Sequence, residues 1–421
     1  MQRNEAGGRG RGRRRQRLRW VSCAVAIALA GCSASTAADG VSTGSIERAS
    51  TSAPATSSTR AAIAAPPTTA ATSPTTTAIA APPTTAAPTT TSAGGAAPSL
   101  PLPPPTVTPS DQIGDPSLSF LRTTFDTLAG GNAASSVTVL RDGAPIFAAA
   151  AGQRIDGAPV TTDTPFVVAS VSKLVTALTI ARLAEAGLVE IDGPLPWTEM
   201  GIAHDPAWAD VTVRELLDHT SGMPIARTTW LDEPGPCSIP LIGVMALPPE
   251  PTRGTWRYSN GNYCALGLLI EHLTGSQLDA AARVTVFDPI AVSGPHLTTD
   301  GAAPDDAPYF KDVARFDRLG GAGTWMASTD DVAAMLAAVS AADMDTLVWP
   351  GIMADQYGWG HTGTVDGAKA CAWVMDGGRT VVVGVVAGNQ PSTGGRLCDS
   401  LVSALAVDLG EWAGEPFRTP I

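Results

Sequence analysis

The chain has 421 residues, a net charge of −12 and a hydrophobic fraction of 44%. The first 31 residues carry eight arginines and one glutamate, so removing their charge of +7 leaves −19 on the remainder. An acidic body without a basic patch excludes nucleic acid as a partner, because the face that binds nucleic acid is basic. The length allows two or three domains.

The N-terminus has the pattern of an export signal. A basic region, Arg3–Arg19, precedes the apolar stretch Trp20–Ala30, which is too short to span a bilayer as a mature helix. The stretch ends in Leu29-Ala-Gly-Cys32, which resembles the lipobox of bacterial lipoproteins. We therefore predict a signal peptide over residues 1–31 and a lipid on Cys32 that anchors the exported protein to the outer face of the bacterial cell membrane. The alternative is an ordinary signal peptide that contains a cysteine, and the export route stays open.

Residues 32–110 are almost entirely Ser, Thr, Ala, Pro and Gly, and the segment Ile63–Ala71 recurs as Ile79–Ala87. Such a composition buries too little apolar surface to offset the entropy of ordering. We predict a disordered linker, which at ~3.1 Å per residue reaches at most about 240 Å. The foldable domain is expected at residues 111–421.

Four cysteines lie beyond the linker, an even number that predicts two disulfides in an exported domain. Three connectivities are possible, and sequence proximity favours Cys237–Cys264 and Cys371–Cys398. Free buried thiols are the alternative. No CxxC or His-rich cluster indicates a metal, and no cofactor is implied.

The predicted elements follow from apolar periodicity and from capping or turn residues. Helices are expected over residues 117–128, 171–186, 212–217, 264–274, 328–335 and 398–412. Strands are expected over residues 136–140, 145–149, 166–169, 370–375 and 380–386. The fold class is therefore α+β, a mainly antiparallel sheet flanked by helices, with an inserted helical subdomain at about 190–340.

The first candidate site pair is a serine and a lysine. The chain has only three lysines, and Lys173 stands three residues after Ser170 at a predicted strand-to-helix junction. Such residues share one helix face, ~5–6 Å apart at Cβ. A desolvated lysine can deprotonate and act as a base, whereas arginine cannot. The pair predicts a serine activated for acyl transfer, with the Ser170 N–H as an oxyanion donor; the alternative is a solvated lysine in an ordinary helix turn.

A second candidate is Tyr258-Ser-Asn260, with the tyrosine expected in a loop. Beside a cationic Lys173, the phenol of Tyr258 is expected to ionise more easily and to shuttle protons to the leaving group. Asn260 is expected to donate its amide N–H to the acyl chain of the substrate. The alternative is a turn built by Asn and Gly.

The third candidate is His361-Thr-Gly-Thr364, expected just before the second predicted hairpin. Gly363 would let a substrate lie against a strand edge, and the N–H of Thr364 would be the second oxyanion donor. The hydroxyls of Thr362 and Thr364 are expected to bind a carboxylate. His361 is expected to keep the site electropositive or to hold Tyr258. The alternative is a surface turn.

These three motifs, separated by 88 and then 103 residues, resemble those of the penicillin-recognising serine hydrolases, which include class C β-lactamases, D-alanyl-D-alanine carboxypeptidases and related esterases. Three further phrases match the same family: Leu216–Pro224, Leu266–Gly275 and Gly320–Asp330. The resemblance covers residues 115–412. It implies a β-lactamase/transpeptidase-like fold, acylation of Ser170 and transfer of the acyl group to water. Lys173 and Tyr258 would form the proton-transfer pair, with the identity of the base left open, and His219 would be structural.

The residue types of the third motif differ between class C β-lactamases and the carboxypeptidases of this family. Class C β-lactamases usually carry Lys-Thr-Gly, so His361-Thr-Gly-Thr364 is more similar to the carboxypeptidases, which act on cell-wall peptides. Some of these carboxypeptidases have an arginine shortly before the third motif that pairs with the substrate carboxylate, but no Lys or Arg occurs from Asp330 to Gly360 here. Either the two threonines bind the carboxylate without it, or the substrate is an uncharged ester or amide. A β-lactamase, an esterase and a catalytically silent wall-sensing lipoprotein are the alternatives. The expected partners are a small peptide, β-lactam or ester and, through the lipid anchor, the membrane. The oligomeric state is open, with a monomer as the default.

Overall fold

The computed structural model describes residues 113–224, 235–309, 311–339, 353–355 and 358–410. The predicted signal peptide, the lipid site Cys32 and the whole predicted linker lie outside these residues. Within the described part, no helix is long and apolar enough to cross a membrane.

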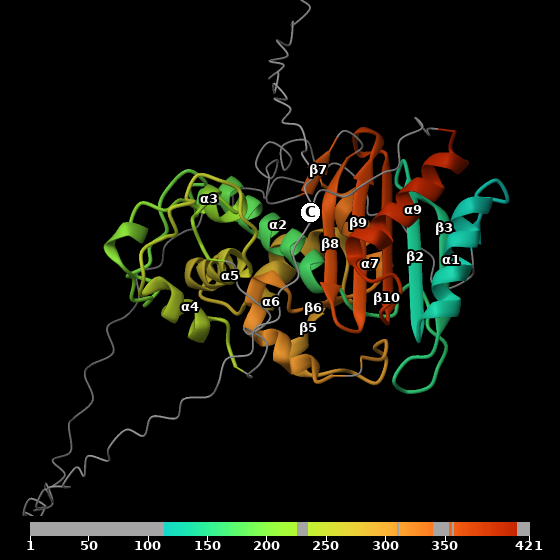
Figure 1. The fold of residues 1–421 in the computed structure, drawn as a ribbon, viewed down its shortest axis with the longest axis horizontal. Coiled ribbons are helices and arrows are strands. Elements are labelled where there is room, and N and C mark those ends of the chain that lie inside the picture. The colour runs from blue at the N-terminus through green and yellow to red at the C-terminus, as the bar shows by residue number, and fades with distance from the viewer. Residues whose placement is uncertain (1–112, 225–234, 310, 340–352, 356–357, 411–421) are drawn as a thin grey trace, which may run out of the picture. The chain divides into compact units, whose positions relative to one another are not determined.

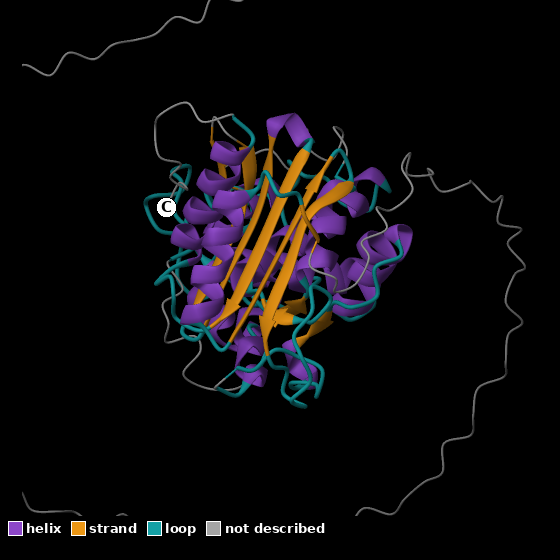
Figure 2. Ribbon diagram, turned by 90° about the vertical axis from the view of Figure 1, so that its right-hand side faces the viewer, coloured by secondary structure: helices purple, strands orange, loops and turns teal. Residues whose placement is uncertain are grey.

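An antiparallel sheet of seven strands lies between two layers of helices (Figures 1 and 2). Across the sheet the strands are β1 (Ile113–Gly114), β3 (Ala144–Gly152), β2 (Ala134–Arg141), β10 (Thr380–Ala387), β9 (Ala368–Met375), β8 (Gly358–Val365) and β7 (Met353–Asp355). Every residue of the central strands β9 and β10 is buried. Their near-continuous apolar sequences follow from this position, because helices cover both faces.

One face of the sheet packs against α1 (Ser119–Gly131) and α9 (Gly394–Asp408). Leu121, Phe125 and Leu401 lie at the centre of this layer. Fully burying side chains of this size contributes about 1.5–3 kcal/mol each. This layer therefore anchors both ends of the described domain to the sheet.

The opposite face packs against α2 (Ser172–Glu185) and α7 (Thr329–Ala337), which share a second core with the helical region inserted between β3 and β7 (Figure 1). The other helices of that region are α3 (Val213–Leu217), α4 (Ser238–Met245), α5 (Asn260–Thr274) and α6 (Leu278–Ala282). The short helical turns are η1 (Ala169–Val171), η2 (Pro206–Trp208), η4 (Arg283–Phe287), η5 (Asp288–Ile290), η6 (Thr298–Asp300), η7 (Val313–Ala322) and η8 (Asp376–Gly378). A small sheet, β4 (Phe166–Val167), β6 (Trp325–Ala327) and β5 (His296–Leu297), completes the fold.

This architecture confirms the predicted α+β class with a helical insertion. Both predicted hairpins are present, and Asp142-Gly143 turns the first with φ of 51° and 78°. The capping box at Thr212 also forms. Two helices begin earlier than predicted, α5 at Asn260 and α9 at Gly394, because Ser259 and Thr393 cap them with their side chains.

His361-Thr-Gly-Thr364 lies just before the strand at Ala370, as predicted, but the motif is itself part of a strand that the sequence did not indicate: it lies inside β8 and pairs along its length with β9. Three glycines give β8 a low strand propensity, which conceals it in the sequence. All three are required by close approach, since a Cβ on Gly358 would collide with the Val374 carbonyl oxygen. A Cβ on Gly360 would collide with the Ala372 carbonyl oxygen, and one on Gly363 would collide with that of Val168. Tertiary packing therefore determines this strand.

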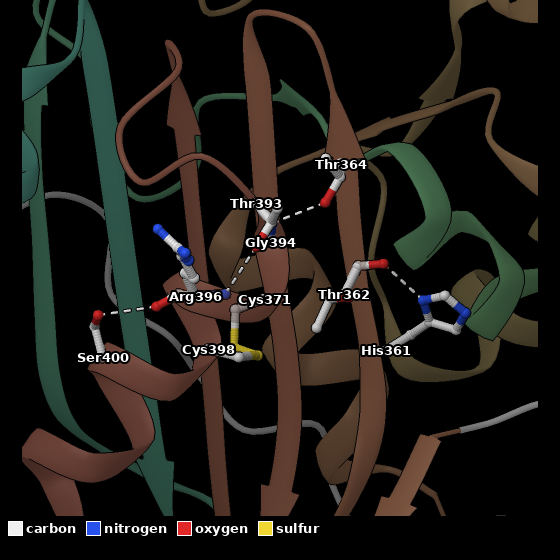
Figure 3. The surroundings of a disulfide bond; sticks show 9 residues. All are labelled: His361, Thr362, Thr364, Cys371, Thr393, Gly394, Arg396, Cys398 and Ser400. Atoms are coloured by element: carbon white, nitrogen blue, oxygen red, sulfur yellow. Dashed lines mark hydrogen bonds between the residues drawn. A yellow bond between two sulfur atoms is a disulfide. The ribbon is translucent and has the colours of Figure 1, made fainter. Parts of the chain in front are cut away.

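Both favoured disulfides are present, Cys237–Cys264 and Cys371–Cys398. The second joins β9 to α9 on the face of the sheet away from the helical insertion (Figure 3). Each closes a loop with a sequence separation of 27 residues, which restricts the unfolded chain.

Candidate active site

Ser170 lies in η1, the single turn between β4 and α2. The preceding residue, Ala169, has φ of 48°, a left-handed conformation that costs a non-glycine residue about 1–3 kcal/mol. Such strain persists where surrounding packing imposes it, and it accumulates at functional sites. Here it turns the chain sharply, so that Ser170 stands at the start of a helical run where N–H groups lack earlier helical partners.

Two groups contact the Ser170 hydroxyl, and two further groups contact Nζ of Lys173. Nζ of Lys173 lies 3.2 Å from Oγ of Ser170, and the phenol of Tyr258 donates to the same Oγ at 2.8 Å. Nζ of Lys173 also donates to Oδ1 of Asn260 at 2.9 Å and to the carbonyl of Ala322 at 2.8 Å. The structure therefore brings together four side chains that sequence reasoning selected, from segments nearly 90 residues apart, and it adds one carbonyl that was not selected.

The protonation state of Lys173 follows from two opposing effects. Its ammonium would gain from the faces of Tyr258 and Tyr263, whose centroids lie 4.8 and 5.6 Å from Nζ, a contact worth up to about 2 kcal/mol when desolvated. Against this, the side chain is 0% exposed. Full burial lowers a lysine pKa by up to about 3–5 units, or roughly 4–7 kcal/mol. Burial dominates and holds the pKa of Lys173 well below its usual value.

The hydrogen bonds around Lys173 fit a neutral amine. The carbonyls of Ala322 and Asn260 accept its two N–H bonds. The remaining lone pair can then accept the O–H of Ser170, while Tyr258 donates to the serine oxygen. The amide oxygen of Asn260 faces the lysine, so its NH₂ group is the part that could make the predicted donation to an acyl chain, which stays a prediction. This pattern favours Lys173 as the base.

The expected easy ionisation of Tyr258 is not supported, because burial raises the pKa of its phenol above the usual value. A desolvated phenolate is costly, and the neutral amine beside it supplies no charge to offset that cost. Tyr258 therefore holds its proton and lies in place as a donor. Its loop position before α5 agrees with the prediction, but Asn260 begins a helix rather than a turn.

His361 does not make the site electropositive. The ring is 1% exposed, and burial lowers its pKa to about 3, so it is neutral at physiological pH. Its Nδ1 lies 2.7 Å from the main-chain carbonyl of Thr362, which can only accept, so Nδ1 carries the hydrogen (Figure 3). The ring centroid lies 6.2 Å from that of Tyr258. His361 therefore packs beside the phenol and does not supply charge.

β8 presents its outer edge to the serine turn. The carbonyl of Thr362 accepts from Nδ1 of His361. Residues two apart in an antiparallel strand direct their N–H and C=O groups to the same edge, so Thr362 and Thr364 share one edge of β8. Gly363 lies against Val168 and Ala169, which brings this edge beside η1. The N–H of Thr364 therefore lies near the serine turn, and its role as the second oxyanion donor stays a prediction.

The carboxylate-binding role of the two threonine hydroxyls remains a prediction. The hydroxyl of Thr364 accepts from the N–H of Gly394, which ties it to the start of α9 (Figure 3). Among the described residues, no group of three or more His, Cys, Asp or Glu side chains is arranged to hold a metal ion.

Sequence reasoning missed two contributors to the site. The carbonyl of Ala322 lies in the segment Gly320–Asp330, and the glycines of that segment were the only sequence feature that could have indicated a close main-chain approach. His219, interpreted as structural, packs its ring 4.6 Å from that of Tyr258. Nothing in its local sequence indicates this contact, because it depends on how α3 meets α5.

Comparisons with known proteins agree with this geometry. The family model named Beta-lactamase matches residues 121–406. Penicillin-binding protein 4 of Amycolatopsis lactamdurans is 29% identical over 181 residues, which are 38% of this chain and 47% of that protein. Esterase EstB of Burkholderia gladioli is 30% identical over 181 residues, 37% of this chain and 44% of that protein. The chain thus spans less than half the length of these relatives.

A solved structure shares the fold. The D-stereospecific amidohydrolase from Streptomyces sp. superposes with a TM-score of 0.55 at 22% identity, covering 65% of this chain and 95% of that one. The family match extends over every strand of the seven-stranded sheet except β1, and over the serine turn and α5. The chain therefore belongs to the beta-lactamase family of serine hydrolases.

Proposed function

We propose that this chain hydrolyses acyl compounds through an acyl-enzyme on Ser170. The observation that carries the proposal is the position of the Ser170 hydroxyl, 3.2 Å from a desolvated amine and 2.8 Å from a protonated phenol. A serine is a weak nucleophile unless an adjacent base removes its proton, and a neutral lysine is such a base.

In the proposed acylation, Ser170 transfers its proton to Nζ of Lys173 as Oγ bonds to the substrate carbonyl carbon. The N–H groups of Ser170 and Thr364 stabilise the oxyanion. Tyr258 donates its proton to the leaving group as the carbonyl carbon releases it, and the ammonium of Lys173 restores the phenol proton. The net transfer is one proton from serine to leaving group, with the acyl group on Oγ.

In deacylation, a water molecule replaces the leaving group and attacks the ester carbonyl. The water gives one proton to the Lys173–Tyr258 pair, and Oγ of Ser170 takes it back as the acid departs. The enzyme returns to its starting state, and the two half-reactions sum to hydrolysis.

The favoured substrate class is cell-wall peptide ending in D-alanyl-D-alanine. The His-Thr-Gly-Thr motif in β8 and the similarity to a penicillin-binding protein support this choice. A short-chain ester is the second candidate. A neutral His361 in the place where class C enzymes have lysine, together with the similarity to an esterase, favours it.

An adduct experiment tests the proposal. Labelled penicillin and a fluorophosphonate are each incubated with wild type and with Ser170→Ala. We expect labelling of the wild type by at least one probe and none of the variant. If neither probe labels the wild type, the chain is a catalytically silent member of the family. Turnover of a D-alanyl-D-alanine peptide, nitrocefin and a short-chain ester then ranks the substrate classes.

We also propose that a lipid on Cys32 anchors the enzyme outside the cell, where its wall substrates lie. The order of basic region, apolar stretch and cysteine supports this localisation. The variant Cys32→Ala should move the protein from the membrane fraction to the medium. Retention of the variant in the membrane fraction would refute the lipid anchor.

A further inference from the structure

The turn after α3 contacts three consecutive residues that carry the tyrosine of the site. The main-chain carbonyl of His219 accepts from the N–H of Arg257 at 2.8 Å. Nδ1 of the same histidine accepts from the N–H of Ser259 at 3.3 Å. Between these two bonds, the imidazole packs against the ring of Tyr258 with centroids 4.6 Å apart. One residue therefore holds the main chain on both sides of Tyr258 and also contacts its side chain.

The tautomer of His219 follows from its partners. A main-chain N–H can only donate, so Nδ1 facing Ser259 must be an acceptor. The amide of Asn262 agrees, because its Nδ2 lies 2.8 Å from Nδ1 while its Oδ1 accepts from the hydroxyl of Ser221 at 2.6 Å. The hydrogen of the neutral imidazole is therefore on Nε2. Burial also lowers the pKa of His219 well below its usual value.

Two features of His219 oppose stability. Its φ of 57° is left-handed, which costs a non-glycine residue about 1–3 kcal/mol. Its Nε2 is buried with no hydrogen-bond partner among the described residues. Leaving a buried donor unpaired costs about 1–3 kcal/mol. An apolar side chain would fill a position that is 1% exposed without the second cost, so packing alone does not account for a histidine here.

We propose that His219 is a positioning residue that holds the phenol of Tyr258 in line with Oγ of Ser170. The effect also reaches Lys173, because Ser259 caps α5, and the first residue of that helix, Asn260, accepts from Nζ. This inference rests on the proposed function, in which Tyr258 protonates the leaving group.

The inference predicts a dependence on the leaving group. An amine leaving group must be protonated as the C–N bond breaks, whereas p-nitrophenolate departs without a proton. Displacing Tyr258 should therefore slow acylation by a β-lactam far more than acylation by p-nitrophenyl acetate. A general loss of structure would slow both acylations to the same extent.

Two substitutions isolate the imidazole. His219→Gly keeps the left-handed backbone without strain but removes the acceptor and the ring. His219→Asn also tolerates the left-handed region and supplies a carbonyl oxygen that can accept from Ser259. Each is measured in the full chain, with fluorescent penicillin and p-nitrophenyl acetate as probes of the acylation rate. Tyr258→Phe and the double variant Tyr258→Phe/His219→Gly complete the set, and thermal unfolding reports folding.

We expect His219→Gly to lower the rate with penicillin by about 10²-fold and the rate with the ester by less than about fivefold. His219→Asn should recover most of the penicillin rate. In the Tyr258→Phe background, His219→Gly should cause no further loss specific to penicillin, because both changes remove the same contribution.

Equal losses on the two probes, or no recovery with asparagine, would overturn the positioning role. If Tyr258→Phe itself shows no difference between the probes, Tyr258 is not the donor, and the proposed mechanism fails at that step, along with the inference. If Tyr258→Phe shows the difference and His219→Gly does not, the mechanism survives and only the inference is lost.

Discussion

Two buried lysines lie in different parts of the molecule with different partners. Lys369, in β9, directs Nζ to three carbonyl oxygens, those of Val365 at 2.6 Å, Asn389 at 2.8 Å and Gly388 at 3.4 Å. Three acceptors match the three N–H bonds of an ammonium. Lys173, at the start of α2, has two carbonyl acceptors and one hydroxyl that can itself donate.

The two lysines also differ in the charges that lie near them. Burial lowers the pKa of Lys369, but the carboxylate of Asp366 acts in the opposite direction. For Lys173, burial lowers the pKa further, and among the described residues no carboxylate counters it. Its place in the first turn of α2 also disfavours a cation, because the positive end of the helix dipole lies there. Burial alone does not make a base; the third partner, a hydroxyl that can donate beside Lys173 and a carbonyl beside Lys369, and the nearest charge distinguish a reactive amine from a structural ammonium.

The largest expected effect comes from removing the titratable amine. Lys173→Arg keeps a cation but cannot act as a base, so acylation of Ser170 should fall by about 10²-fold or more. The matched control, Lys369→Arg, should acylate within about threefold of wild type, since it is outside the proposed machinery. Both rates are measured with fluorescent penicillin. A near-normal rate for Lys173→Arg would exclude lysine as the base.

A carboxylate placed beside Lys173 should turn its neutral amine into an ammonium. Asn260→Asp places a carboxylate where an oxygen now accepts from Nζ of Lys173 at 2.9 Å. An adjacent opposite charge raises a lysine pKa by about 1–3 units, so acylation at neutral pH should fall about 10- to 100-fold.

The pH dependence separates this charge effect from a lost substrate contact. In Asn260→Asp, the rise of the acylation rate with pH should move to higher pH, and the rate should recover in alkaline solution. Asn389→Asp, the equivalent change beside Lys369, should leave the profile unchanged. A loss in Asn260→Asp that is uniform at all pH values would show that the carboxylate does not act through Lys173.

A smaller effect is expected from moving β8. Gly363→Ala introduces a Cβ that collides with the carbonyl of Val168, so the strand should shift away from η1. A shift of about 1 Å can reduce catalysis by up to about 10²-fold, and we expect roughly tenfold. Gly130→Ala in α1, where an added Cβ meets nothing within 4 Å, is the control for a glycine-to-alanine change that causes no collision. Unchanged acylation in Gly363→Ala would mean that the edge of β8 does not serve the reaction.

The smallest expected effect concerns the pH dependence of the acylation rate of the wild type. Because the pKa of Lys173 is lowered, its neutral fraction, and with it acylation, should rise as pH increases through that lowered pKa. The rate should fall again only in strongly alkaline solution, since the pKa of Tyr258 is raised. His361, with a pKa of about 3, should add no step near pH 6–7. A step there that disappears in His361→Gln would contradict the neutral histidine.

Local parts of the site were predictable from the sequence. Ser170 and Lys173 share one helical turn, so their spacing alone places them on one face. Outside the site, the capping box at Thr212 and the Asp142-Gly143 turn were also predictable from the sequence, because a few adjacent residues determine each of them.

The remainder depends on contacts between distant segments. β8 was not predicted as a strand, because its glycines serve close approach to η1 and β9 and give it a low strand propensity. The charge of His361 and the ionisation of Tyr258 were misjudged because desolvation cannot be read from neighbours in the chain. The proposed role of His219 depends on a left-handed turn that meets α5, which no local pattern indicates.

The most direct test is the titration of the lysine side chains. The chain contains only three lysines, so a protein labelled with ¹³C-lysine gives three side-chain signals, which Lys173→Arg, Lys311→Arg and Lys369→Arg assign. The account predicts that the Lys173 signal titrates well below the usual lysine pKa of about 10.4, and below that of Lys369. A Lys173 signal that titrates at the usual value would contradict a neutral amine beside Ser170.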